Sequence, residues 1–406
     1  QKTSEVPTAV GAAPQPAPVA AVAPQPQPQL QPLPQPQPQP LPLLPEEPGE
    51  PGEPGVPITL PILDAMFADE TFAGELGSKL GLSDGQILQL RVIARAATAD
   101  LREREDGSTQ AAANDAARQL RGIVSDAELA ALTRFVHEHW SKDEDGNIDR
   151  PSAASNLANG VPSDTRIVVN APAYRMDIFR DGVLLKTYKI GIGYPEFPLP
   201  TGLRRATSII FNPSWTPPDE PWVEGKFAAG RQVDAGSALN PLGPIKIPIG
   251  MPSLIHGGKA AGRLGGFASH GCVGLTDGQV KDFAAMLAEI SNTRISAIEL
   301  DSYAADTSTT KRVKLAAAIP VELRYETIVV EDGKLLIYRD VYERGTDTEE
   351  RVRAVLAANG VSLDALTDRE RAAITRGLRR MALDASGKVP AEPTNARRST
   401  SAAVPR

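Results

Sequence analysis

One cysteine and two histidines lie close together in the sequence, and together these residue types can perform nucleophilic catalysis. Cys272 is the single cysteine of the chain; His270 lies just before it, and His256 precedes it across a short glycine-rich spacer. A thiol with its usual pKa of about 8.5 is a weak nucleophile, and an imidazole that takes its proton makes it a strong one. We therefore predict a cysteine nucleophile with a histidine base. The alternative is an inert cysteine in a glycine-rich loop with incidental histidines.

The residues around Cys272 suit an acyl-transfer site. Gly271 allows a substrate to approach the backbone closely. The amides of Gly271 and Cys272 can donate hydrogen bonds to an oxyanion. The sequence Thr276-Asp277-Gly278-Gln279 predicts a capped helix directly after the cysteine. The N–H groups at the start of that helix add positive potential near the sulfur.

This region resembles the signature of the L,D-transpeptidases with a YkuD-type catalytic domain. The signature is a histidine, a spacer of similar length, and then Ser269-His270-Gly271-Cys272 and a hydrophobic residue, Val273. Three upstream segments also resemble family segments and come in family order: PTG at 200–202, FNPSWTPP at 211–218 and NPLGP at 240–244. The resemblance covers about Thr165 to Leu300. The stretch Val321 to Tyr342 resembles a C-terminal hairpin extension of larger Gram-negative-type members.

The resemblance implies a substrate and a reaction. Family members act on peptidoglycan stem peptides, in which a thiolate attacks the carbonyl of the third residue, usually meso-diaminopimelate, and releases the terminal D-alanine. The thioester then passes to an amine of another stem, which gives a 3–3 cross-link, or to an amine of an envelope protein, or to water. We therefore expect a cell-wall L,D-transpeptidase, with no cofactor and no metal. The alternatives are an L,D-carboxypeptidase and a catalytically idle peptidoglycan-binding envelope protein.

The resemblance also implies roles for individual residues. Cys272 corresponds to the nucleophile and His256 to the general base, with the second ring nitrogen of His256 held by a backbone carbonyl such as that of Gly257. His270 and Gly271 line the site, and the amides of Gly271 and Cys272 bind the oxyanion. Ser269 supports the loop, and Ser269, Gly257, Arg263 and Trp215 are the expected substrate-binding residues.

One position departs from the family pattern. Where the family commonly places Asn or Arg after the hydrophobic residue, this chain has Gly274. We expect the missing side chain to affect how the substrate is bound more than the chemistry of the nucleophile. Arg263, in the spacer, is a candidate for the missing positive contact, and a solvated arginine is the alternative.

Composition bounds the rest of the chain. About half of the 37 prolines lie in the segment 1–57, which has too few apolar residues to build a core. The net charge of −7 argues against nucleic acid as a partner. A single cysteine excludes an internal disulfide, and no apolar run is long enough to predict a membrane span. Because the chain begins with Gln1 rather than Met, we expect a removed export signal and a periplasmic or cell-envelope location.

Periodicity predicts an α+β protein that is mainly β. Helical spacing and capping boxes recur between Ile62 and Trp140, and from Thr165 short strands alternate with turns, which predicts a curved sandwich or barrel-like catalytic domain. A helix follows Thr276, and residues 295–300 predict a further strand. The expected parts are a disordered Pro/Gln-rich stalk (1–57), a helical accessory domain (58–150), the catalytic domain (160–303), a β-hairpin extension (304–345), a helical segment (346–385) and a disordered tail (386–406).

Three further features are weaker. The turn Asp143–Asp149 resembles part of a calcium loop, but Ser141 and Ser152 stand where two of the strongest ligands belong, so a solvated acidic turn is the favoured interpretation. His137 and His139 are spaced i, i+2, which separates them around a helix and makes a poor metal pair. The segment Pro217–Asn240 is predicted to be a lid over the active site.

Overall fold

The computed structural model describes residues 57–99, 101, 107–140, 142, 160–215, 232–237, 239–250 and 252–382. Residues 1–56 of the predicted stalk lie outside the described residues, as do the Asp143–Asp149 turn and the tail from Ser386. Most of the predicted lid, including Trp222 and Phe227, also lies outside them. The predictions made for these segments stay predictions.

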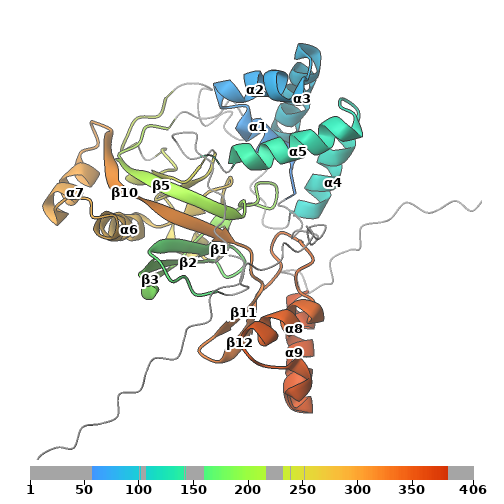
Figure 1. Ribbon diagram of the computed structural model, residues 1–406. Coiled ribbons are helices and arrows are strands. Elements are labelled where there is room, and N and C mark those ends of the chain that lie inside the picture. The colour runs from blue at the N-terminus through green and yellow to red at the C-terminus, as the bar shows by residue number, and fades with distance from the viewer. Residues whose placement is uncertain are drawn as a thin grey trace, which may run out of the picture. The chain divides into compact units, whose positions relative to one another are not determined.

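The N-terminal helices form where the capping residues and apolar spacing predict them. Ser83 and Ser125 each exchange hydrogen bonds with the residue three positions later, Gln86 and Glu128, which closes the capping boxes of two of these helices. Their apolar faces share one core, in which Phe72, Leu90 and Val136 are fully buried. The helices are α1 (Leu60–Met66), α2 (Glu70–Leu80), α3 (Asp84–Ala99), α4 (Thr109–Leu120) and α5 (Asp126–Trp140) (Figure 1).

A mixed eight-stranded sheet forms the centre of the predicted catalytic domain. Its spatial order is β3-β2-β1-β10-β5-β6-β7-β9, in which β1/β10 and β7/β9 are parallel pairs and the other neighbours are antiparallel. A separate parallel pair joins β4 to β8. The strands are β1 (Arg166–Asn170), β2 (Arg175–Arg180), β3 (Val183–Lys189), β4 (Ile192–Gly193), β5 (Gly202–Phe211), β6 (Ile245–Pro248), β7 (Leu254–His256), β8 (Phe267–Ser269), β9 (Val273–Gly274) and β10 (Lys311–Arg324).

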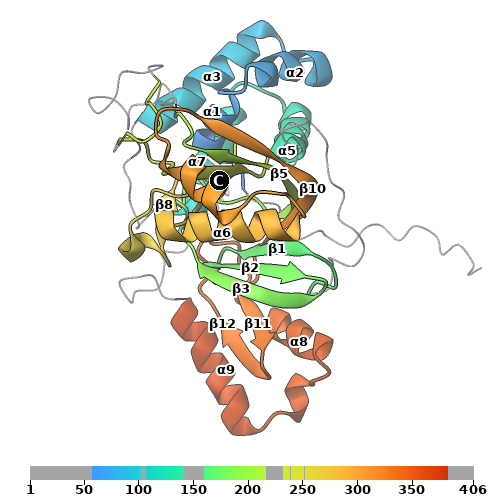
Figure 2. The same cartoon turned by 90° about the vertical axis from the view of Figure 1, so that its left-hand side faces the viewer.

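Helix α6 (Asp277–Ile290) covers one face of this sheet (Figure 2). The predicted capping box is present: Thr276 and Gln279 each accept a hydrogen bond from the other's backbone. Val280, Phe283 and Leu287 of α6 are fully buried in the core that the sheet supplies. The helix is therefore fixed by its apolar face, and it begins shortly after Cys272.

The strand predicted at residues 295–300 is wrong, because this segment starts a helix. Ser296 and Glu299 form a capping box, and α7 runs over Ala297–Ala305. Leu300 and Ala304 of α7 join the core beneath the sheet. The capping box at Ser296 favours a helix and outweighs the strand preference of the β-branched residues on either side.

The predicted hairpin over Val321–Tyr342 is only partly present. Residues 311–324 form β10, which pairs with β1 and β5 inside the main sheet, so the sheet extends past the predicted boundary at residue 303. The hairpin itself is shorter and consists of β11 (Ile328–Glu331) and β12 (Lys334–Ile337). It packs with α8 (Glu349–Ala358) and α9 (Asp368–Met381) around a small core of its own.

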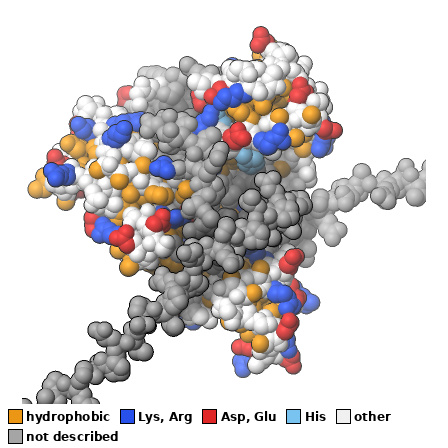
Figure 3. Space-filling view, viewed as in Figure 1, with side chains coloured by type: hydrophobic (Ala, Val, Ile, Leu, Met, Phe, Trp, Pro, Cys, Tyr) orange, Lys and Arg blue, Asp and Glu red, His pale blue; other side chains and the backbone are white. Residues whose placement is uncertain are grey.

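The predicted class, α+β and mainly β in the catalytic region, is confirmed by this arrangement of one mixed sheet with helices. No helix within the described ranges has the length and apolar character needed to cross a membrane. On the face shown in Figure 3, acidic and basic side chains are interspersed rather than gathered by sign.

Candidate active site

Strands β7 and β9 bring Cys272 and His256 to the same face of the sheet. The two strands are parallel, with Ile255 opposite Val273 and His256 opposite Gly274. Cys272 lies one residue before β9 and two before Gly274, so alternation along the strand turns its side chain to the face that His256 shares. His256 is therefore the last residue of β7, and Cys272 directly precedes β9, the neighbouring strand of the same sheet.

The hydrogen bond at Nδ1 of His256 fixes which ring nitrogen can act as a base. Nδ1 lies 2.7 Å from the carbonyl oxygen of Gly257. A carbonyl oxygen can only accept, so Nδ1 carries the proton, and Nε2 keeps the lone pair that can take a proton from a thiol. This is the contact that the resemblance implied for Gly257.

Burial keeps the imidazole of His256 neutral. The residue is 3% exposed. Burial, with a smaller contribution from the positive charge of Lys259, lowers the pKa of His256 to about 3, although the Gly257 carbonyl pulls in the opposite direction. At neutral pH His256 is therefore a base and not a cation.

Burial also acts on the thiol. Cys272 as a residue is half-buried, and burial around its sulfur raises the pKa of the thiol above its usual value. The backbone N–H of Leu254 and the charges of Lys259 and Lys246 pull this pKa down, without overcoming burial. Because His256 is neutral as well, the resting site holds a protonated thiol, which needs a base at the moment of attack.

Serine side chains shape the loop before the cysteine. Ser269 is buried, and its hydroxyl donates to the carbonyl of Cys272 while accepting from the Cys272 N–H at 3.1 Å. Ser269 thus ties the two ends of this turn together, and its predicted role toward a substrate stays a prediction. The same bond engages the Cys272 amide, which the resemblance proposed as an oxyanion donor, so that role requires Ser269 to release the amide. The Gly271 amide stays a prediction.

Gly271 occupies a conformation that favours glycine, with φ at 84°. Its carbonyl accepts from the Ser253 hydroxyl at 2.9 Å, and Ser253 in turn lies 3.4 Å from the indole nitrogen of Trp140 in α5. A Cβ on Gly193 would come within 3.1 Å of the Gly271 backbone, so the two glycines pack closely. The backbone before Cys272 therefore has two supports, the Ser253 hydrogen bond and the packing of Gly193. Neither Ser253 nor Trp140 was predicted, because no short motif marks them.

His270 lies among aromatic side chains. Its ring centre is 4.9 Å from that of Phe197 and 5.3 Å from that of Tyr194. Arg263 donates to the Tyr194 hydroxyl at 2.7 Å and to the Phe267 carbonyl at 3.1 Å. The structure therefore places His270 and Arg263 in one cluster around Tyr194, half-buried and next to the loop that carries Cys272.

The remaining predicted substrate residue, Trp215, lies at the edge of the described chain. It is half-buried and pairs through its backbone with Val233. Its relation to a substrate stays a prediction. Within the ranges that the structure describes, no three His, Cys, Asp or Glu side chains are arranged to hold a metal ion.

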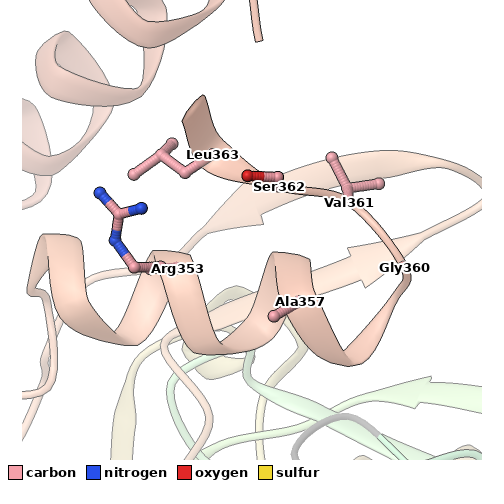
Figure 4. A pocket seen from close by; sticks show the side chains of 6 residues that line it. All are labelled: Arg353, Ala357, Gly360, Val361, Ser362 and Leu363. Carbon is pink, nitrogen blue, oxygen red and sulfur yellow. The ribbon is translucent and has the colours of Figure 1, made fainter. Parts of the chain in front are cut away.

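A cavity of about 420 Å³ lies far along the chain from these residues. Figure 4 shows it at the end of α8, lined by Arg353, Ala357 and residues 360–363. Arg353 forms an ion pair with Asp364 at 2.8 Å. None of the residues lining this cavity belongs to the strands or loops that carry Cys272 and His256.

Comparison with protein families matches part of the chain. Residues 164–310 match the model of the L,D-transpeptidase catalytic domain (YkuD). No curated protein matches the chain.

Solved structures similar to the chain include several L,D-transpeptidases. The catalytic domain of the Enterococcus faecium L,D-transpeptidase is 17% identical, with 40% of this chain and 98% of that chain covered and a TM-score of 0.26. An L,D-transpeptidase from Mycobacterium smegmatis is also 17% identical, with 40% and 58% covered and a TM-score of 0.26. A structure described as the Ldtfm–avibactam carbamoyl enzyme is 18% identical with a TM-score of 0.27, and the match covers 41% of this chain and 50% of that one.

The match of the family model includes β1 to β9, α6 and both predicted catalytic residues. Residues 164–310 of this chain therefore match the L,D-transpeptidase catalytic domain (YkuD) family.

Proposed function

We propose that the protein is a cell-envelope L,D-transpeptidase in which Cys272 is the nucleophile and His256 the general base. The observation that supports the proposal most is the pairing of β7 with β9, which brings the chain segments of His256 and Cys272 side by side within the part of the chain that matches the family model. The Nδ1–H bond to Gly257 leaves Nε2 as the proton acceptor. Peptidoglycan stem peptides are the proposed substrates.

The proposed first step is acylation of Cys272. Nε2 of His256 takes the thiol proton as the sulfur attacks the carbonyl carbon of the third stem residue. The tetrahedral intermediate then expels the amine of the terminal D-alanine, which receives the proton that His256 took up. The products are a thioester on Cys272 and free D-alanine.

The proposed second step transfers the acyl group to an amine. The side-chain amine of a neighbouring stem attacks the thioester and gives up a proton to His256, and the thiol is restored when that proton returns to the sulfur. The new bond is a 3–3 cross-link. An amine of an envelope protein, or a water molecule, takes the place of the stem amine in the alternative reactions. Each attacks the thioester and gives up a proton to His256 in the same way.

The test is incubation of the full chain with disaccharide-tetrapeptides, with products separated and weighed by mass spectrometry. Cross-linked dimers together with released D-alanine are expected. Tripeptides alone would show a carboxypeptidase, and unchanged tetrapeptides would show a binding protein that lacks the reaction.

Two variants assign the residues in the same assay. Cys272→Ala should abolish turnover while the circular dichroism spectrum is retained. His256→Ala should lower the rate about 10²–10⁴-fold, and His137→Ala, a histidine on α5, should lower it much less. Full activity of the alanine variant at 272 would end the proposal, and a wild-type rate for His256→Ala would move the base to His270.

A further inference from the structure

The side chain of Lys259 lies over Gly274, on the face that Cys272 and His256 share. A Cβ built on Gly274 would come within 2.8 Å of Lys259 Cγ and 3.2 Å of its Cε. Gly274 is opposite His256 in register and two residues after Cys272, a separation of about 7 Å along an extended strand. The lysine stem therefore fills the space that a side chain at position 274 would occupy, next to both predicted catalytic groups.

The backbone at Lys259 is held in place. Its N–H donates to the Leu275 carbonyl at 3.1 Å, and Leu275 donates back to the His256 carbonyl at 2.8 Å. The preceding Gly258 donates to the Asp277 carboxylate at the start of α6, at 2.7 Å. The turn that follows His256 is thus tied to the chain that follows Cys272, so the lysine starts from a fixed point beside the site.

We propose that Lys259 is a positioning residue of this site, whose ammonium group stabilises the thiolate of Cys272 as the thiol loses its proton. The inference rests on the proposed role of Cys272 as the nucleophile. No bond to Lys259 forms or breaks; the thiol proton goes to His256, and the lysine keeps its own proton throughout. A fixed cation near a thiol favours the anionic form of the sulfur.

The charged and titratable groups around the thiol come from several elements. The charges that act on the thiol are those of Lys259 and of Lys246 on β6. The other titratable groups on the adjoining segments are His256 on β7, His270 on the loop before Cys272, and Asp277 at the start of α6. Lys259 lowers the pKa of both Cys272 and His256, and Lys246 adds a weaker effect of the same sign. Because the two lysines also lower the pKa of His256, its imidazole is neutral before the reaction. The positive charge near the developing thiolate therefore comes from the lysines and not from His256.

The test is the rate at which iodoacetamide alkylates the full chain, measured between pH 5 and pH 10 by intact mass. Alkylation reports Cys272 alone, since the chain has one cysteine. His256, with a pKa of about 3, stays neutral across this range. For Lys259→Met, which keeps the length of the stem without its charge, we expect alkylation at pH 7 to fall about three- to tenfold, with the midpoint of the profile moved to higher pH.

Three further variants separate charge from shape. Lys259→Arg should keep the wild-type profile, because it restores the cation. Lys334→Met, which removes an exposed lysine on β12, should leave the profile unchanged. Gly274→Ala keeps every charge, but its methyl group would displace the Lys259 side chain at Cγ, so alkylation should slow. In a Lys259→Ala background, Gly274→Ala should not slow alkylation any further.

The outcomes separate this inference from the proposed function. A folded Lys259→Met variant with the wild-type pH profile overturns the role of Lys259, whatever the enzyme does with peptidoglycan. If the Met variant does not fold, a wild-type profile for Gly274→Ala overturns it instead. If the pH profile of alkylation depends on Lys259 but the protein leaves tetrapeptides unchanged, the inference about Lys259 stands and the proposed transpeptidase function is rejected.

Discussion

Ser253 and Gly271 are joined by a hydrogen bond of 2.9 Å from the serine hydroxyl to the glycine carbonyl. The bond ties the residue that precedes β7 to the residue that precedes Cys272. It therefore couples the two chain segments that carry His256 and Cys272, and both partners are buried.

Ser253→Ala should slow acylation of Cys272 and destabilise the fold. The change leaves a buried carbonyl without its donor, which typically costs about 1–3 kcal/mol of unfolding free energy. The rate of acylation by a carbapenem should fall, because the Gly271 backbone loses one of its two supports. Ser291→Ala is the matched control, since Ser291 is equally buried and donates to the Ala288 carbonyl at the end of α6. It should lose stability and acylate normally; equal acylation rates in both variants would contradict the coupling.

Trp140→Phe should have a smaller effect in the same direction. The indole nitrogen lies 3.4 Å from the Ser253 hydroxyl, a long hydrogen bond, and phenylalanine keeps an aromatic ring in the buried site without the donor. We expect a loss of about 0.5–1.5 kcal/mol of unfolding free energy and a modest fall in acylation rate. In a Ser253→Ala background the change should not slow acylation further. If the two substitutions lower the acylation rate additively, Trp140 acts on the site by a route that does not involve Ser253.

The buried His256 should make the protein sensitive to acid. The folded state holds the pKa of His256 near 3, whereas an unfolded histidine titrates near 6.5. The unfolded chain therefore binds the proton more readily, so this stability is present above about pH 6.5 and is lost as pH falls toward 3. Urea unfolding of wild type and His256→Gln should diverge by about 2–3 kcal/mol between pH 6.5 and pH 4, with the variant losing less. Buried His139 titrates in both proteins, so its effect cancels in the comparison. Parallel curves would show that His256 is not held neutral by the fold.

How much the sequence predicts depends on whether the deciding interaction is local. The capping boxes at Ser83, Ser125 and Thr276 involve residues three apart, and each was predicted and is present. The pairing of Cys272 with His256 was predicted from residue type and spacing, and from a family signature. A local signal also explains the error at 295–300, where the box formed by Ser296 and Glu299 outweighs β-branched neighbours.

The features missed by the sequence analysis depend on contacts between distant residues. Residues 311–324 alternate as a strand would, but only pairing with β1 and β5 shows that they belong to the main sheet. Lys259 is close to His256 in the sequence, yet the place of its side chain over Gly274 depends on the absence of a side chain at that glycine, which comes later in the chain. Gly274 was noticed as a departure, and Arg263 was the predicted compensation; in the structure Arg263 contacts Tyr194 and Phe267.

The junction of β1 and β10 should depend strongly on one buried carboxylate. Glu322 on β10 accepts from Arg166 of β1 at 2.8 Å and from Arg324 at 3.0 Å. Arg166 is 7% exposed and Glu322 is 6% exposed. Arg166 keeps its ion pair with Asp164 when Glu322 is removed but loses a buried, charged hydrogen-bond partner, so Glu322→Ala should cost about 1–3 kcal/mol of unfolding free energy in urea. Glu289→Ala, which removes the exposed partner of Arg180, should cost less than about 1 kcal/mol. In the sheet β5 and β6 separate this junction from β7, so Glu322→Ala should acylate Cys272 at the wild-type rate at temperatures where it remains folded. A stability loss equal to that of the Glu289 variant would show that the buried pair does not hold β1 to β10.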